Sequence, residues 1–211
     1  MSRALGPAFY ARDTELVARD LLGAVLECTA GGTRCRARIV ETEAYVGEHD
    51  AACHAAAGRT ARTEVLYGPP GRAYVYFVYG MHWCVNAVTR RAGLPSAVLI
   101  RAVEPLEGIP VMRRRRRRRR GRDDIELTNG PAKLCEALGI TGAHHGVSLT
   151  RSPLRILAGD RIGDGDVAVT PRIGIVRSAD WPLRWVVRES KYVSAKRATE
   201  RYLRPGANGR R

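Results

Sequence analysis

The sequence predicts an α+β fold, in which a single compact domain over residues 1–211 surrounds a mainly antiparallel sheet. A chain of 211 residues is the size of one domain with a substantial core. Two pairs of strand-like segments are each separated by a short glycine-containing turn, at Gly31-Gly32 and at Gly80-Met81. Such turns join antiparallel neighbours. Segments with helical spacing, 14–22 and 131–138, supply the α component.

The first elements expected along the chain are a helix and a hairpin. Asp13 is a suitable N-cap for a helix over 14–22, and Gly23 provides its end. Residues 24–28 have the composition of a strand, which turns into a longer strand over 34–45. The second strand carries the most unusual polar pattern in the sequence.

The rest of the chain is expected to contain strands, one long connection and one further helix. The glycine- and proline-rich connection over 47–71 is long enough to be functional, and its alanine-rich part favours a helical turn near 50–57. A second hairpin is expected over 73–89, followed by an almost continuously apolar strand over 96–103. A proline at its start and a glycine at its end delimit the helix over 131–138. Short strands are expected at 154–157, 167–169 and 185–187.

Two carboxylates and an aromatic ring share one predicted face of the strand over 38–45. Ile39, Glu41, Glu43 and Tyr45 alternate with the residues of the opposite face. Such a face suits the lining of a cleft, where a carboxylate activates water beside a stacked ring. An edge strand with a solvated acidic face accounts for the same pattern, and this stretch alone leaves both interpretations open.

A single charge interrupts the apolar strand over 96–103. Because an unpaired buried charge is costly, Arg101 must be paired or face a site. The carboxylates of Glu41 and Glu43 are the obvious partners, either in a structural ion pair or in a functional one.

Tyrosines are concentrated in the hairpin over 73–89. Tyr74 and Tyr76 fit an ordinary strand, in which aromatic residues are common, and they also fit a surface that stacks on nucleobases. Tyr79 is harder to assign to a core because it lies beside the exposed turn.

The chain is strongly basic, with a net charge of +15 and a pI near 10.5. Arg113 to Arg120 form an unbroken run of eight arginines, and 15 − 8 leaves +7 on the remainder. A polyanion is therefore the expected partner, with nucleic acid ahead of an anionic membrane surface. Repulsion between like charges predicts a disordered or solvated loop over 112–124, and residues 197–211 are expected to form a basic tail.

Cysteine and histidine usage argues against disulfides and against a metal site. The five cysteines are odd in number and lack CxxC spacing, and the histidines supply no ligand pattern. Reduced thiols and no metal or cofactor are therefore expected. The first residues lack the pattern of an export signal, and no apolar run of about 18 residues predicts a membrane span.

Several separated blocks together resemble one known protein family. They are RIVETEAY (38–45), CH (53–54), YVYFVYGMHWCVN (74–86), VLIRAVEPLEG (98–108) and GPAKLCEALGI (130–140), in this order. The ordered set closely resembles the alkyladenine (3-methyladenine) DNA glycosylases of the mixed α/β type without helix-hairpin-helix. The resemblance extends over nearly the whole chain and implies a curved sheet with a protruding β-hairpin that intercalates into DNA.

The resemblance also implies roles for individual positions. Glu43 matches the general base of the family, while Arg101 and the carbonyl of Ile173 match the two further contacts of the attacking water. The base-binding positions are Tyr45, His54, Tyr76 and Asn86, of which the two tyrosines sandwich the flipped base and the asparagine disfavours guanine. The DNA-intercalating positions are Tyr79, Met81 and His82, the last of which stands where vertebrate members carry another aromatic residue.

The function implied is that of a base-excision-repair glycosylase. Such an enzyme flips alkylated or deaminated purines out of duplex DNA and hydrolyses the N-glycosidic bond, leaving an abasic site. The three lysines lie outside the pocket positions, so we expect a monofunctional hydrolase without lyase activity. The expected partner is duplex DNA containing damaged purines, with no membrane and no cofactor. The protein is expected to be a monomer, cytoplasmic and nucleoid-associated in a bacterium or nuclear in a eukaryote.

Other functions fit parts of the same pattern. A non-catalytic damaged-DNA binder could keep the fold, and a structured-RNA binder would share the basic surface. An inverting sugar hydrolase would use Glu41 and Glu43, which are about 6.6 Å apart by strand rise. The combination of Glu43, Arg101 and Tyr79 favours the glycosylase. The preferred lesion stays open: hypoxanthine, 3-methyladenine, 7-methylguanine and ethenoadenine all fit a stacked slot of this kind.

Overall fold

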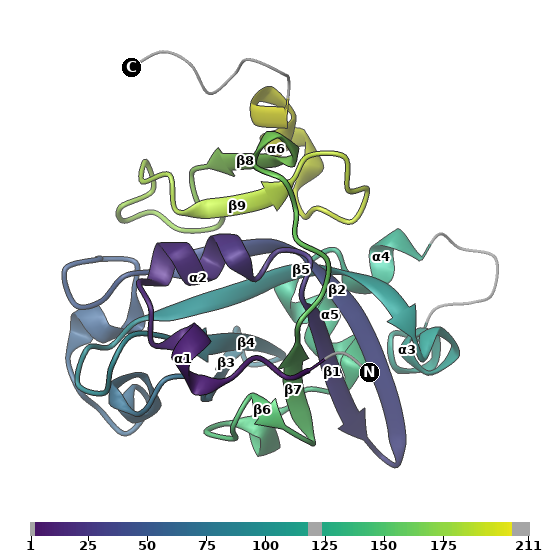
Figure 1. Cartoon of the computed structure of the whole chain (residues 1–211), viewed down its shortest axis with the longest axis horizontal. Helices are drawn as coiled ribbons and strands as arrows, with labels where there is room; N and C mark the ends of the chain where they lie inside the picture. The colour runs from purple at the N-terminus through teal and green to yellow at the C-terminus, as the bar shows by residue number, and fades with distance from the viewer. Residues whose placement is uncertain (1–2, 118–123, 204–211) are drawn as a thin grey trace.

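The computed structural model describes residues 3–117 and 124–203, which form a curled antiparallel half-barrel with a few helices (Figure 1). The nine strands of the described part form one sheet, with the path β3-β4-β5-β2-β1-β7-β6, while β9 pairs with both β2 and β8. The strands are β1 (Val25–Ala30), β2 (Thr33–Tyr45), β3 (Ala73–Val78), β4 (His82–Val88), β5 (Ala97–Glu107), β6 (Thr150–Arg151), β7 (Leu154–Leu157), β8 (Val167–Thr170) and β9 (Arg184–Val187). The predicted antiparallel sheet in an α+β domain is confirmed.

Helices are short and lie around the sheet. The α-helices are α1 (Pro7–Tyr10), α2 (Thr14–Asp20), α3 (Ile109–Arg115), α4 (Ile125–Thr128), α5 (Pro131–Leu138) and α6 (Lys196–Leu203). Single 3₁₀ turns are η1 (His54–Ala57), η2 (Glu64–Tyr67), η3 (Gly142–His144) and η4 (Asp164–Asp166). Figure 1 shows β8, β9 and α6 grouped together above the rest of the sheet. In the described part of the chain, no helix combines the length and the apolar character needed to cross a membrane.

The helices predicted over 14–22 and 131–138 are present as α2 and α5, and α2 ends at Asp20, two residues before the predicted end. The side chain of Asp13 accepts a hydrogen bond from the backbone N–H of Glu15 (3.1 Å) at the start of α2. Gly139 takes the left-handed conformation that ends α5. The apolar faces of both helices pack on the sheet and form the main core with β1 and β2.

β2 is the central strand of the molecule. It pairs with β5 along most of its length, with β1 through its first half, and with β9 at Glu41–Glu43. The carboxylates of Glu41 and Glu43 are fully buried. The alternative of a solvated acidic edge strand is therefore wrong, because neighbouring strands cover both sides of this segment.

A β-bulge in β2 changes which of its residues share a face, compared with the prediction. The register against β5 shifts between Ile39 and Glu41, so two residues of β2 oppose one step of β5. Ile39 consequently packs in the main core together with Ala44. The prediction that Ile39 shares a face with Glu41 and Glu43 is wrong, since strict alternation does not survive a bulge.

The second predicted hairpin is present as β3 and β4. Tyr79 and Gly80 lie in its turn with positive φ angles of 52° and 66°. A positive φ is ordinary for glycine and uncommon for tyrosine, which marks the Tyr79 backbone as strained. β5 extends to Glu107, beyond the predicted end at residue 103, because it continues to pair with the first half of β2.

Residues 112–115 are helical, which corrects that part of the predicted disordered or solvated loop over 112–124. Residues 109–115 form α3, and Met112 is buried in the main core. Arg113 forms a bidentate ion pair with Asp124 (2.8 Å), and Arg115 donates to the carbonyls of Ala30 (2.9 Å) and Ala137 (3.1 Å). Arg113 and Arg115 are two positions apart on α3 and reach different acceptors, and these contacts offset part of the mutual repulsion that the prediction assumed. Residues 118–123 of the run lie outside the described residues.

The predicted basic tail over 197–211 begins as a helix. α6 covers Lys196–Leu203, and the buried Thr199 hydroxyl interacts with Arg184 (3.0 Å). The buried guanidinium of Arg184 therefore anchors the first part of the predicted tail. Residues 204–211 lie outside the described residues.

Candidate active site

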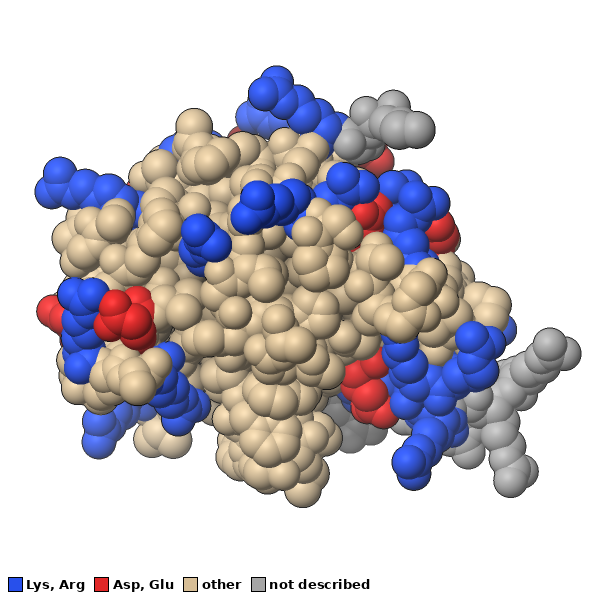
Figure 2. All heavy atoms as spheres, turned by 90° about the horizontal axis from the view of Figure 1, so that it is seen from below, with Lys and Arg blue, Asp and Glu red and all other residues tan. Residues whose placement is uncertain are grey.

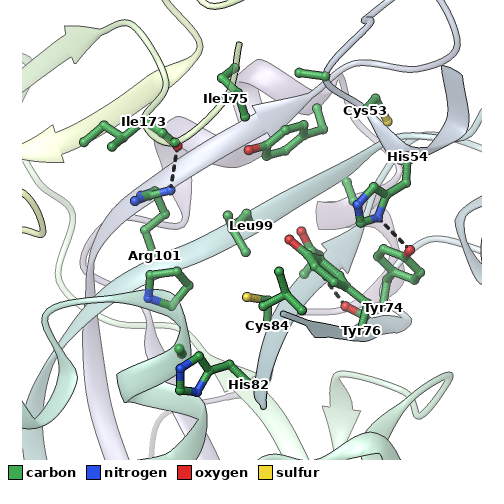
Figure 3. Close-up of a pocket in the computed structure, with 18 of the residues that line it drawn as sticks. Cys53, His54, Tyr74, Tyr76, His82, Cys84, Leu99, Arg101, Ile173 and Ile175 are labelled. Carbon is green, nitrogen blue, oxygen red and sulfur yellow. Dashed lines mark hydrogen bonds between the residues drawn. The ribbon is translucent and has the colours of Figure 1, made fainter. Parts of the chain in front are cut away.

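A pocket of about 370 Å³ opens between the end of β2, the β3–β4 hairpin, β5 and the loop over 173–175. Its walls include Tyr45, His54, Arg62, Tyr74, Tyr76, Tyr79, His82, Cys84, Asn86, Leu99, Arg101 and Ile173. Figure 3 shows Arg101 and Ile173 on one side of this pocket, with His54, Tyr74 and Tyr76 gathered on the other. A separate small apolar cluster around Leu66, Tyr74 and Val88 supports the aromatic side. The volume lies within the range of small-molecule sites.

Glu43 joins three pocket-lining residues through its carboxylate. Its Oε1 accepts from the backbone N–H of Ile173 (2.8 Å). Its Oε2 accepts from the hydroxyl of Tyr45 (2.9 Å) and from Nη1 of Arg101 (3.1 Å). The same Nη1 donates to the carbonyl of Ile173 (3.3 Å), as the dashed line in Figure 3 marks. The structure thus brings Glu43, Arg101 and Ile173 together, although they come from β2, β5 and a distant loop.

Glu43 itself is 0% exposed and lies directly behind the pocket wall. An ionised carboxylate offers about four lone-pair sites, and the three hydrogen bonds above leave one for a further donor. The side chains of Arg101 and Tyr45 stand between the carboxylate and the pocket.

Glu41 is fixed in a different ionic cluster. Its Oε1 accepts from Nε of Arg184 (2.7 Å), from Oγ of Ser194 (2.8 Å) and from Nε of Arg101 (3.1 Å). Its Oε2 accepts from the backbone N–H of Ser194 (2.6 Å). Glu41 is fully buried and accepts four hydrogen bonds, and of its three partner residues Arg101 lines the pocket while Arg184 and Ser194 do not. This arrangement disfavours the paired-carboxylate sugar hydrolase.

The charges around Glu43 are set by burial and by these contacts. Burial opposes the charge of Arg101, but Glu43 and then Glu41 outweigh it and raise the pKa of the guanidinium. Burial, reinforced by the negative charge of Glu43, raises the pKa of the Tyr45 hydroxyl well above its usual range. Tyr45 therefore remains a proton donor to Glu43 at neutral pH.

The aromatic wall consists of three rings in mutual contact. His54 and Tyr76 meet edge to face with centroids 4.5 Å apart, and Tyr74 lies 5.5 Å from Tyr76. Nδ1 of His54 and the hydroxyl of Tyr74 are hydrogen-bonded at 2.8 Å. Burial, and then the charge of Arg62, lower the pKa of His54, so its imidazole is neutral at pH 7. The wall presents a rigid, uncharged surface to a ligand.

Asn86 and Arg62 frame this wall. The side-chain amide of the buried Asn86 donates to the carbonyl of Tyr74 (3.0 Å), which fixes the asparagine at the pocket. The guanidinium of Arg62 lies 5.6 Å from the centroid of Tyr76 at the pocket edge. Arg62 was missed at the sequence level because nothing in its neighbourhood distinguishes it from other surface arginines.

The three positions assigned to intercalation differ in their surroundings. Tyr79 is 84% exposed and Met81 is 67% exposed, both beyond the paired part of the hairpin. Tyr79 and His82 also line the mouth of the pocket. The hairpin tip thus places two exposed apolar side chains beside the opening.

An ion pair between Asp50 and Arg172 is the main feature that the sequence analysis missed. Both side chains are fully buried, and the guanidinium lies 4.7 Å from the centroid of the Tyr45 ring. The long loop containing Asp50 was recognised as a functional candidate, and Arg172 directly precedes Ile173. Their separation of 122 residues gave no sequence signal for a contact.

Comparison with known proteins agrees with the resemblance noted in the sequence. Residues 8–191 match the methylpurine-DNA glycosylase (MPG) family. A Myxococcus xanthus protein with the name "Putative 3-methyladenine DNA glycosylase" is 49% identical over 193 residues, covering 90% of this chain and 93% of the relative. A protein of the same name from Carboxydothermus hydrogenoformans is 47% identical over 189 residues, covering 89% and 97%. The predicted family is confirmed, and the chain belongs to the methylpurine-DNA glycosylase family.

Proposed function

We propose that the pocket receives a purine flipped out of duplex DNA. We further propose that Glu43 activates a water molecule, which displaces the purine from C1′ of its sugar. Membership of the family makes the protein a monofunctional DNA N-glycosylase that acts in base excision repair of alkylated purines. The observation that carries the assignment of roles is the junction of Glu43, Arg101 and the Ile173 carbonyl at the pocket wall. Arg101 and Ile173 would hold the water while Glu43 accepts its proton.

The proposed reaction is a hydrolytic displacement at C1′ of the flipped nucleotide. The water oxygen forms a bond to C1′, the C1′–N bond breaks, and the bonding pair leaves with the base. The water proton passes to Glu43, which is positioned as a general base. A purine alkylated at N3 or N7 carries a positive charge, so it leaves as a neutral base without being protonated. A deaminated purine such as hypoxanthine carries no such charge and leaves with the bonding pair as an anion, so we propose it as a slower substrate.

Water reaches Glu43 in this proposal by opening one hydrogen bond. The Nη1 of Arg101 spans from Glu43 to the carbonyl of Ile173, and its bond to the carbonyl is the longer of the two at 3.3 Å. Insertion of water at this point would give it an acceptor in the carbonyl, a donor in the guanidinium and the fourth site of the carboxylate. Hydrogen bonds of this kind commonly tighten or rearrange when substrate binds.

The flipped base is held between Tyr45 and Tyr76 in this proposal. A base taken out of the helix loses its stacking partners, and an aromatic side chain restores about 1–3 kcal/mol per base. The backbone at His54 contacts the base edge, and Asn86, fixed by its bond to Tyr74, disfavours the exocyclic amino group of guanine. Selectivity then combines easier flipping of a damaged base with the shape of the slot.

The hairpin tip and the basic surface are proposed to engage the duplex. Tyr79, with Met81 and His82 beside it, would fill the gap left by the flipped nucleotide, at a cost of a few kcal/mol for unstacking. Blue lysine and arginine side chains predominate over red acidic ones on the face in Figure 2. Such a surface contacts phosphates and makes binding depend steeply on salt. We propose that the protein acts as a monomer wherever the genomic DNA lies, at the nucleoid of a bacterium or in a eukaryotic nucleus.

The experiment that tests this function is single-turnover base release with enzyme in excess. Matched duplexes contain one 7-methylguanine, one hypoxanthine, one ethenoadenine or no lesion. We expect release from at least one damaged duplex, with an abasic strand that breaks only after alkali, and none from the undamaged duplex. Tight binding to damaged duplex without release of any base would favour the non-catalytic binder. Stronger binding to structured RNA than to duplex in a competition at fixed salt would favour the RNA binder.

A further inference from the structure

Arg172 makes four hydrogen bonds inside the protein through its two terminal nitrogens. Its Nη1 donates to the carbonyl of Ala44 (3.0 Å) and to Oδ2 of Asp50, and its Nη2 donates to Oδ1 of Asp50 (2.8 Å) and to the carbonyl of Ser178 (3.2 Å). These acceptors come from the end of β2, the loop after it and the loop that carries Ile173. A single planar side chain therefore links three segments of the pocket wall.

Asp50 extends this connection along its own loop. Its carboxylate also accepts from the backbone N–H of Val46 (3.2 Å) and of Ala52 (3.1 Å). The loop so organised leads directly to His54 in the aromatic wall. Loss of either charged partner would leave the other buried and unpaired.

The same guanidinium covers one face of the ring of Tyr45. Its central carbon lies 4.7 Å from the ring centroid, which is a cation–π contact. Tyr45 lines the pocket. Arg172 is buried behind it and is not one of the described residues that line the pocket. The hydroxyl of Tyr45 is meanwhile held by Glu43. One face of the ring is thus left for a ligand, with a cation directly behind it.

The buried charges around the pocket balance. Three carboxylates (Glu41, Glu43 and Asp50) face three guanidiniums (Arg101, Arg172 and Arg184). Asp50 binds Arg172 through both oxygens, so the ion pair behind Tyr45 is neutral as a unit. Without Asp50, the arginine would remain charged, because a guanidinium does not lose its proton in proteins.

We propose that the Asp50–Arg172 pair is a specificity-determining element, which fixes Tyr45 and neutralises the charge behind it so that the pocket accepts a cationic purine. This inference rests on the proposed function, since it takes Tyr45 as a surface on which the flipped base stacks. A cationic base on the open face would be separated from the guanidinium only by the ring. An unpaired guanidinium would repel that base and leave a neutral base nearly unaffected.

The test compares two lesions in one protein preparation. The cationic lesion is 7-methylguanine, and the neutral one is hypoxanthine or ethenoadenine, whichever the wild type releases faster. The quantity measured is the ratio of their single-turnover release rates, in which a loss of folded protein cancels. For Asp50→Asn, we expect the ratio of cationic to neutral release to fall at least tenfold below that of the wild type. An equal fall in both rates would mean that the pair is only structural and would overturn the proposal.

Further variants separate the effect of the Arg172 charge from the effect of its structural contacts. Arg172→Gln and the double variant Asp50→Asn/Arg172→Gln leave no cation behind Tyr45, so their rates fall but the ratio does not. A tenfold fall of the ratio in Arg172→Gln would overturn the proposal even if Asp50→Asn did not fold. The matched control is Glu27→Gln, which removes another buried carboxylate between two arginines, Arg36 and Arg155, away from the pocket. Its ratio is expected to equal that of the wild type, and a change there would also overturn the proposal.

The outcomes also separate this inference from the function on which it rests. If the wild type released no base from any damaged duplex, the proposed function and the inference would both fail. If the wild type released both lesions and the ratio were unchanged in Asp50→Asn, only the inference would fail.

Discussion

Glu41 and Glu43 lie two residues apart on β2, and both are fully buried, yet the structure surrounds them differently. Glu41 is held by Arg184, Ser194 and Arg101, on the side where β9 and α6 pack. All three partners of Glu43, namely Tyr45, Arg101 and Ile173, form the pocket wall. The residue type is the same, so the partners decide which carboxylate can do chemistry.

The comparison predicts that the largest effect on the reaction comes from Glu43→Gln. General-base catalysis contributes about 10²–10⁴-fold, and we expect a fall of that size in single-turnover base release. The amide is isosteric, so binding of damaged duplex is expected to persist. Rapid-quench release and equilibrium binding check the two parts, and near-normal release would remove Glu43 from its role.

The complementary change, Glu41→Gln, is expected to act on folding instead. Replacing a buried carboxylate between two guanidiniums leaves their charges under-compensated, and breaking such a pair costs about 3–5 kcal/mol. The free energy of unfolding, measured in urea, should fall by that order, while the folded fraction retains most of its release rate. A variant as stable as the wild type would show that this ionic cluster is dispensable.

Tyr79 gives a third case for the comparison, because its side chain is neither buried nor in contact with Glu43. Tyr79→Ser removes a ring that is 84% exposed, so the free energy of unfolding should hardly change. Loss of stacking by about 1–3 kcal/mol is expected to weaken capture of the flipped base by roughly 5- to 150-fold. Ethenoadenine fluorescence reports flipping, and the salt dependence of binding to undamaged duplex serves as the control. Equal loss of both kinds of binding would make Tyr79 structural.

The smallest expected effect concerns the pH dependence of stability. Burial, and then Arg62, lower the pKa of His54, so the folded protein binds its proton less tightly than the unfolded chain. This contribution is complete above the unfolded-state pKa of about 6.5 and is lost as the pH falls through the folded-state value. Between about pH 7.5 and 5.5, His54→Gln should therefore lose less stability than the wild type. Urea unfolding at both pH values tests this, and parallel losses in the two proteins would contradict it.

Much of the fold follows from local sequence patterns. The two hairpins and the helices α2 and α5 form because alternation, turn glycines and caps act between near neighbours. The bulge after Ile39 was not predictable, since it depends on how β2 pairs with β5. The order in α3 depends similarly on Asp124 and on carbonyls of other segments, which the composition of the arginine run does not reveal.

The candidate site was also predictable only in part. The resemblance of ordered blocks identified Glu43, Arg101 and Ile173 as positions that should meet, and the structure places them within hydrogen-bonding distance. Reasoning from the residues alone left Glu41 and Glu43 as equals, because alternation gives a face and not its partners. Arg172 and Asp50 escaped both approaches, since their ion pair joins two loops far apart in the sequence.

The most direct test of the account measures the two carboxylate variants side by side on one damaged duplex. Single-turnover base release is followed with saturating enzyme, at a temperature where circular dichroism shows both proteins to be folded. We expect Glu43→Gln to lose at least about 10²-fold in rate, and Glu41→Gln to stay within about tenfold of the wild type. A larger loss in Glu41→Gln than in Glu43→Gln would contradict this expectation and assign the base to the other carboxylate.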